Sequence, residues 1–277
     1  MTPNVVVPKP KDLGGFSVRR VLPALECRSL GPFVFFDVMG PLILKTGLEL
    51  EVRPHPHIGL STLTWLFEGG LMHRDSLGSV QVIHPGEVNL MTAGRGIVHS
   101  ERASQANLQL GDSIHGAQFW LALPKAHEDC APAFAHHAAE SITNGVILGE
   151  WQGTRSPVQF PHPALCVDLT LKAGERLAFP PLHAERGVYI VSGGLEIGSE
   201  QHEANRLLVL EAGTTVDMKA IGRTQLLLIG GEPLDGPRYL DWNFVASSKE
   251  RLVRAREDWK AGRFPKVPGE TEYIPYP

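Results

Sequence analysis

The fold class can be read from two segments, LSTLTWLFEGG (residues 60–70) and VQVIHPGEVNLM (residues 80–91). In both, a run rich in Val, Ile, Leu or Phe ends at Gly or Pro, which is the pattern of a β-strand followed by a turn. The same pattern flanks them in PFVFFDVMG (32–40) and AQFWLAL (117–123). No sustained helical period before residue 245 competes with it. The first half of the chain is therefore predicted to be strand–turn–strand structure.

The pattern breaks at PKAHEDCAPAFAHHAAESIT (124–143), which is rich in Pro, Ala and charge, and resumes in ALCVDLTLKAGERLAF (164–179). Alternating polar and apolar residues in the latter are typical of half-buried strands. We therefore place a domain boundary in the break, with domains at 1–132 and 133–277. Two halves of similar size, each of many short strands, predict a duplicated β-sandwich or barrel.

A helix is expected only near the carboxyl terminus, in SSKERLVRAREDWKAGRF (247–264). Ser247 followed three residues later by Glu250 forms a capping-box pattern. Three apolar residues share one face of the predicted helix: Leu252, Ala255 and Trp259. Gly262 is the residue at which we expect the helix to end.

Composition excludes several classes of protein. The 43% of hydrophobic residues exclude a mainly disordered chain, and no apolar run approaches the roughly 20 residues of a membrane-spanning helix. The net charge of -4 provides no general attraction to nucleic acid. Three widely separated cysteines argue against a disulfide framework. We expect a monomeric cytoplasmic protein that binds neither membrane nor nucleic acid.

Two short strings combine metal-binding residue types, His55-Pro56-His57 and His99-Ser100-Glu101. Residues i and i+2 of a strand point to the same face, so each string aims two such side chains in one direction. Two strands facing each other across a barrel would offer three imidazoles and one carboxylate, donors that suit divalent Fe, Ni, Cu, Mn or Zn. Either string alone has a simpler explanation, because the chain holds 12 histidines. The occurrence of both favours a metal site.

The sequence from His55 to Arg102, preceded by LGPFVFFDVMGP (30–41), resembles the amino-terminal half of the pirins, a family of the cupin superfamily. The segment 230–264 resembles the carboxy-terminal domain of bacterial pirin-like proteins. The resemblance implies an all-β bicupin of two antiparallel jelly-roll barrels, with a C-terminal α-helix that packs on the assembly. It also implies one metal ion in the first barrel, Fe(II) before Ni, Cu, Mn or Zn.

Carried over residue by residue, the ligands of the family fall on His55, His57, His99 and Glu101. The neighbouring polar residues are candidates for a substrate pocket or for support of the ligands, and these are His73, Asp75, Gln118 and Trp120. A solvated turn is an equal alternative for His73 and Asp75, and core packing is one for Trp120.

Four protein ligands around an octahedral ion leave two positions free, as oxygen chemistry on non-haem iron requires, whereas a tetrahedral zinc site would be closed. The resemblance implies dioxygenation of a flavonol of the quercetin type, with a small aromatic substrate and dioxygen as partners. Glu101 would then serve as the catalytic base. The alternative is an iron-dependent regulator whose affinity for a protein partner follows the oxidation state of the metal.

Overall fold

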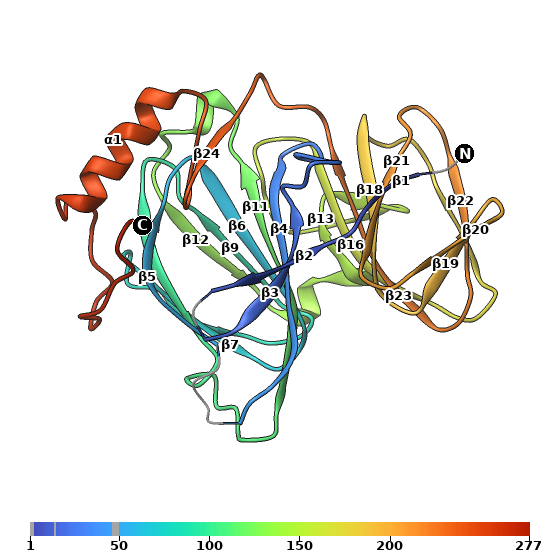
Figure 1. The fold of residues 1–277 in the computed structure, drawn as a ribbon, viewed down its shortest axis with the longest axis horizontal. Coiled ribbons are helices and arrows are strands. Elements are labelled where there is room, and N and C mark those ends of the chain that lie inside the picture. The colour runs from blue at the N-terminus through green and yellow to red at the C-terminus, as the bar shows by residue number, and fades with distance from the viewer. Residues whose placement is uncertain (1–2, 14, 46–49) are drawn as a thin grey trace. The chain divides into compact units, whose positions relative to one another are not determined.

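The computed structural model describes residues 3–13, 15–45 and 50–277, and it consists mainly of antiparallel strands (Figure 1). Two large sheets and two four-stranded sheets account for most of them. They form two barrels, which we call the first and the second barrel in chain order. The predicted all-β class, the two antiparallel cupin-type barrels and the single C-terminal helix are thereby confirmed.

The first barrel joins a four-stranded sheet of order β5-β10-β7-β8 to a seven-stranded sheet of order β12-β9-β6-β11-β4-β3-β2. The four-stranded sheet contains β5 (Glu51–His57), β7 (Leu71–Asp75), β8 (Val80–Ile83) and β10 (Ile97–Arg102). The seven-stranded sheet contains β2 (Lys9–Asp12), β3 (Ser17–Leu22), β4 (Phe33–Ile43), β6 (Leu60–Glu68), β9 (Val88–Thr92), β11 (Ser113–Ala122) and β12 (Ala133–His137). The two strings predicted to bind a metal, His55–His57 and His99–Glu101, therefore lie on neighbouring strands of the smaller sheet.

The second barrel repeats this plan with a four-stranded sheet of order β17-β22-β19-β20 and a six-stranded sheet of order β1-β21-β18-β23-β16-β13. The four-stranded sheet contains β17 (Arg176–Phe179), β19 (Gly194–Ile197), β20 (Glu200–Glu203) and β22 (Val216–Ala220). The six-stranded sheet contains β1 (Asn4–Val6), β13 (Val146–Leu148), β16 (Ala164–Leu171), β18 (Glu185–Ser192), β21 (Arg206–Leu210) and β23 (Thr224–Gly231). The core of this barrel is a large cluster of buried aliphatic and aromatic side chains.

Short elements complete the described chain. Two hairpins pair β14 (Glu150–Trp151) with β15 (Thr154–Arg155) and β24 (Tyr239–Asp241) with β25 (Phe244–Ala246). Single 3-10 turns occupy Lys125–His127, Ala139–Ser141 and Thr143–Gly145.

The compact units of the chain are assembled from non-contiguous segments. One unit comprises Lys11–Val18, Asp37–Ala139 and Asp235–Pro277, and the other comprises Met1–Pro10, Arg19–Phe36 and Glu140–Leu234. The terminal segment with the helix thus belongs with the first barrel, whereas the linear division at residue 132 had grouped it with the second. A linear pattern of composition cannot show such an exchange of segments, because it depends on which strand edge each segment pairs with.

The C-terminal helix α1 spans Lys249–Lys260 and packs against β25. Its N-cap is Ser248, whose hydroxyl accepts a hydrogen bond from the backbone N–H of Arg251 at 3.3 Å. The predicted cap, Ser247, was wrong by one residue: its hydroxyl instead donates to Glu128 Oε2 at 2.7 Å.

The last helical residue is Lys260 and the C-cap is Ala261; Gly262, the residue predicted to terminate the helix, follows with a positive φ of 67°. The N–H of Gly262 bonds the carbonyl of Trp259, and the N–H of Arg263 bonds the carbonyl of Asp258, as in a Schellman motif. No helix among the described residues is long and apolar enough to cross a membrane.

Candidate metal centre

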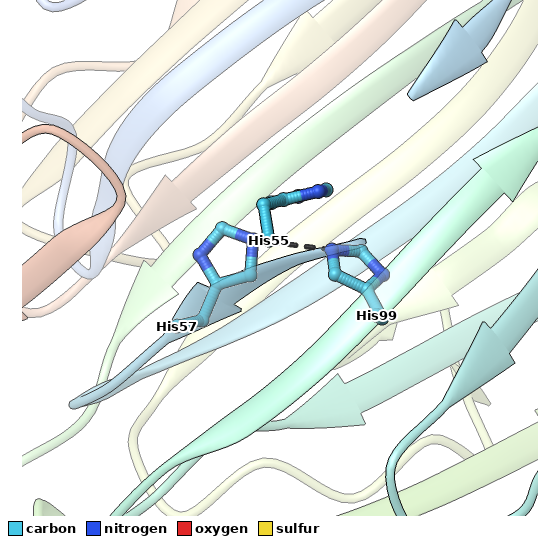
Figure 2. Close-up of side chains that lie close together, drawn as sticks. All are labelled: His55, His57 and His99. Atoms are coloured by element: carbon cyan, nitrogen blue, oxygen red, sulfur yellow. Dashed lines mark hydrogen bonds between the residues drawn. The ribbon is translucent and has the colours of Figure 1, made fainter. Parts of the chain in front are cut away.

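Three histidines meet inside the first barrel, contributed by two paired strands. In the antiparallel ladder of β5 and β10, His99 lies opposite His55, while His57 lies two residues further along β5. The three ring centroids are between 4.4 and 5.0 Å apart, and Figure 2 shows the rings gathered around one point. None is more than 6% exposed. The alternation of the strands thus brings together the three predicted imidazoles, whose ring nitrogens approach within 4.8 Å of one another.

The hydrogen bonds of two of these rings determine which nitrogen is free. His55 Nδ1 lies 2.9 Å from the carbonyl oxygen of Arg53, and His57 Nδ1 lies 2.9 Å from that of Asn243. A carbonyl oxygen can only accept, so each Nδ1 carries the proton and donates. In the neutral rings, each Nε2 then holds an unshared lone pair that can bind a cation.

The third ring is oriented by a chain of side chains on β7. Asp75 Oδ2 accepts a hydrogen bond from His73 Nε2 at 3.0 Å, and Asp75 Oδ1 accepts from the backbone N–H groups of Leu77 and Ser79. The other ring nitrogen of His73, Nδ1, lies 3.4 Å from His99 Nδ1. Where His73 Nδ1 accepts this hydrogen bond, His99 donates from its own Nδ1, and its Nε2 carries no proton.

Burial keeps these imidazoles neutral. It lowers the pKa of His55 to about 4, and together with neighbouring histidine charges it lowers the pKa of His57 and His99 well below the ordinary value. Asp75 stays ionised: burial acts to raise its pKa, but hydrogen bonds from His73 and Ser79 bring it below the ordinary value.

Two of the three histidine rings approach each other through their Nε2 atoms, and a cation between these atoms would bind both. His57 Nε2 and His99 Nε2 lie 3.1 Å apart, the contact marked in Figure 2. When both Nδ1 atoms donate to the partners described above, neither Nε2 carries a proton, and two lone pairs face each other in a buried space. The donors present therefore fit a divalent metal ion, which would accept both lone pairs.

Glu101 lies beside this group on the same face of β10. It forms a second cluster with His73 and His99, whose ligand atoms are also within 4.8 Å of one another. Gln118 Nε2 donates to Glu101 Oε1 at 3.2 Å, and Thr64 Oγ1 donates to Gln118 Oε1 at 2.7 Å. Burial raises the pKa of Glu101 and outweighs the opposite effects of His73 and Gln118.

The other predicted pocket residues also lie in the interior. Trp120 packs edge-on against His57, with ring centroids 5.1 Å apart. His73 is buried and stacks on Phe134 of β12 at 4.4 Å, so the solvated turn considered for His73 and Asp75 is not what the structure has. The carbonyls of Arg53 and Asn243 escaped sequence reasoning, because a backbone acceptor leaves no signature in the side chains.

Two family models match the chain: pirin over residues 15–121, and the pirin C-terminal cupin domain over residues 166–265. A pirin-like protein of Caulobacter vibrioides is 45% identical over 280 aligned residues, which cover 96% of each chain. The chain belongs to the pirin family.

Two further relatives of this pirin carry names that refer to an activity. A Pseudomonas aeruginosa protein provisionally named quercetin 2,3-dioxygenase is 39% identical, over 90% of this chain and 80% of its own. The crystal structure of a quercetin 2,3-dioxygenase from Acinetobacter baumannii matches with a TM-score of 0.89 at 36% identity, over 99% of this chain and 94% of that one. This pirin thus has the two-barrel fold of those proteins and a histidine cluster able to hold a metal ion.

Proposed function

We propose that this pirin binds one divalent metal ion per chain in the first barrel and uses it to dioxygenate a flavonol of the quercetin type. The proposed ligands are the side chains of the two strings: His55, His57, His99 and Glu101. The observation that carries the proposal is the 3.1 Å approach of two buried ring nitrogens from different strands, His57 Nε2 and His99 Nε2. The names of the relatives at 36% and 39% identity supply the substrate class.

Iron(II) is the metal we propose first, with Ni, Cu, Mn and Zn as the alternatives to be tested. When bound, it supplies Lewis acidity toward a substrate hydroxyl and redox chemistry toward dioxygen. Both oxygen atoms enter the substrate in a dioxygenation, so no external reductant is required. The proposed set of four protein ligands favours an ion with a coordination number above four. Around a tetrahedral ion, the same four ligands would leave no position for substrate or dioxygen.

Glu101 is the proposed base that accepts the proton of the substrate hydroxyl. Gln118 donates to Oε1 of Glu101, so Oε2 would receive the proton once Glu101 has loosened from the metal. Trp120 and Gln118 are the proposed pocket residues, whereas His73 and Asp75 act on the site through His99.

The test is a turnover assay with defined metal content. Metal-free protein is loaded with Fe(II) anaerobically and mixed with quercetin and oxygen, and the flavonol absorbance should fall over many turnovers. His57→Ala and Glu101→Ala should abolish this loss, while His84→Ala, at an exposed histidine, should not. Glu101→Gln keeps an oxygen donor and removes the base, so it should bind metal better than Glu101→Ala without restoring turnover.

Unchanged turnover in His57→Ala or Glu101→Ala would refute the mechanism. Tight metal binding without turnover for any first-row metal would instead favour the regulator. Oxidation from Fe(II) to Fe(III) adds a positive charge in a buried site, where its field is weakly screened and could bias a partner surface. Metal-dependent binding of a partner protein would then be the property to measure.

A further inference from the structure

The chain after α1 returns across the first barrel and ends beside β5 (Figure 1). Within this return, Glu270 Oε1 accepts hydrogen bonds from Ser100 Oγ and from Arg102 Nη1, both at 2.6 Å. The side chains of Arg102 and Glu270 are 10% and 7% exposed, and Ser100 is 1% exposed. Glu270 is therefore a buried, charge-paired anchor on β10, although it lies far from that strand in the sequence.

Glu270 binds the face of β10 that is opposite to the face of the proposed ligands His99 and Glu101. Successive side chains of a strand point to opposite faces, so Ser100 and Arg102 project away from the face of His99 and Glu101. They also bracket Glu101 along the chain. Glu270 thus holds β10 on both sides of Glu101, from the face opposite to that of His99 and Glu101.

The same return segment supports β5 where its ladder is irregular. His99 pairs with His55, but Glu101 pairs with Val52, so β5 uses one residue more than β10 between these pairs. Such a bulge interrupts the ladder and re-aims the neighbouring side chains. The carbonyl of Pro54, inside the bulge, accepts a hydrogen bond from the backbone N–H of Ile274 at 2.8 Å. The return segment therefore contacts both strands at the level of the histidines.

We propose that Glu270 is a positioning residue of the metal centre, which holds His99 and Glu101 in coordinating geometry by binding Ser100 and Arg102 on the opposite face of β10. This inference rests on the metal site proposed above. Metal–ligand distances tolerate deviations of only about 0.2 Å, so a small rotation of β10 separates the donors from the ion. Ligand-supporting residues typically change metal affinity by about 10–100-fold when replaced.

The test compares metal affinity in isosteric variants. Glu270→Gln keeps the shape and an accepting oxygen but removes the charge, and we expect its dissociation constant for Co(II), measured by chelator competition, to rise about 10-fold. Ser100→Ala removes one of the two bonds and should give a smaller rise. Glu272→Gln is the matched control, because Glu272 is 61% exposed and its carboxylate lies 3.8 Å from Arg102, so its affinity should stay at the wild-type value.

The spectrum of bound Co(II) separates positioning from general instability. In Glu270→Gln the visible bands of Co(II) should shift, because the donors are displaced. In metal-free Ser100→Ala the midpoint of thermal unfolding should stay near that of the wild type. Equal affinity and an identical spectrum in wild type, Glu270→Gln and Ser100→Ala would overturn the inference. If the wild type itself binds no Co(II), the proposed metal site fails first, and the two failures are thus distinguishable.

Discussion

The small sheets of the two barrels have the same order, β5-β10-β7-β8 in the first and β17-β22-β19-β20 in the second. Their registers can therefore be superposed pair by pair. In the first barrel His99 lies opposite His55 and Ile97 opposite His57. The equivalent pairs of β22 and β17 are Met218 with Leu177 and Val216 with Phe179.

Five polar side chains of the candidate metal centre have apolar counterparts in the second barrel. In the order His55, His57, His99, Glu101 and His73, the counterparts are Leu177, Phe179, Met218, Ala220 and Leu195. All five counterparts belong to one buried core cluster. The jelly roll thus folds with an apolar interior, as in the second barrel, or with a polar one, as in the first. The polar interior serves function rather than folding. Its buried polar groups need hydrogen-bond partners such as Asp75 and Gln118.

Phe179→Ala is expected to have the largest effect on stability. Phe179 is fully buried and packs edge-on against Trp151, with centroids 5.3 Å apart. The loss of its ring leaves a cavity, which should lower the free energy of unfolding by about 3–5 kcal/mol. Chemical denaturation measures this loss, and metal titration of the folded variant should show unchanged affinity. A cost below about 1 kcal/mol would mean that the second barrel is not the packed core that its contacts indicate.

His99→Met gives the first barrel the residue type that the second barrel has at the equivalent position, Met218. It should weaken metal binding at least about 100-fold, because one imidazole is lost from the proposed set of four ligands. The metal-free variant should be as stable as the wild type or more stable by about 1 kcal/mol, since an apolar side chain replaces a buried polar one. Chelator competition and denaturation of the metal-free protein give the two numbers. Retained affinity would show that His99 is not a ligand.

The sequence was sufficient for the convergence of the histidines, because alternation in strands fixes which residues share a face. It was also sufficient for the end of the helix at Gly262, where a positive φ is required. It could not choose between Ser247 and Ser248 as the cap, since both are serines and only the three-dimensional position of Glu128 decides. Nor could it reveal the Asn243 carbonyl behind His57, which depends on how β24 and β25 pack.

A difference in acid sensitivity between two buried arginines sharpens the comparison and is the smallest effect we expect. In the second barrel, Arg186 donates to four backbone carbonyls, those of Phe179, Pro180, Glu211 and Thr214. These acceptors do not titrate. In the first barrel, Arg102 depends on a carboxylate, Glu270. Burial acts to raise the pKa of Glu270, but the bonds from Arg102 and Ser100 bring it below the ordinary value of 4.5.

A folded-state pKa below the unfolded one means that the Arg102–Glu270 pair stabilises the protein fully above pH 4.5, and that this stability is lost as the pH falls through the folded-state value. The free energy of unfolding of metal-free wild type should therefore exceed that of Glu270→Gln at neutral pH, and the excess should shrink on acidification. The other titrating groups are shared by both proteins, so they cancel in the difference. A difference that stays constant with pH would mean that the pKa of Glu270 is the same in the folded and unfolded states, so that pairing with Arg102 does not favour the ionised carboxylate.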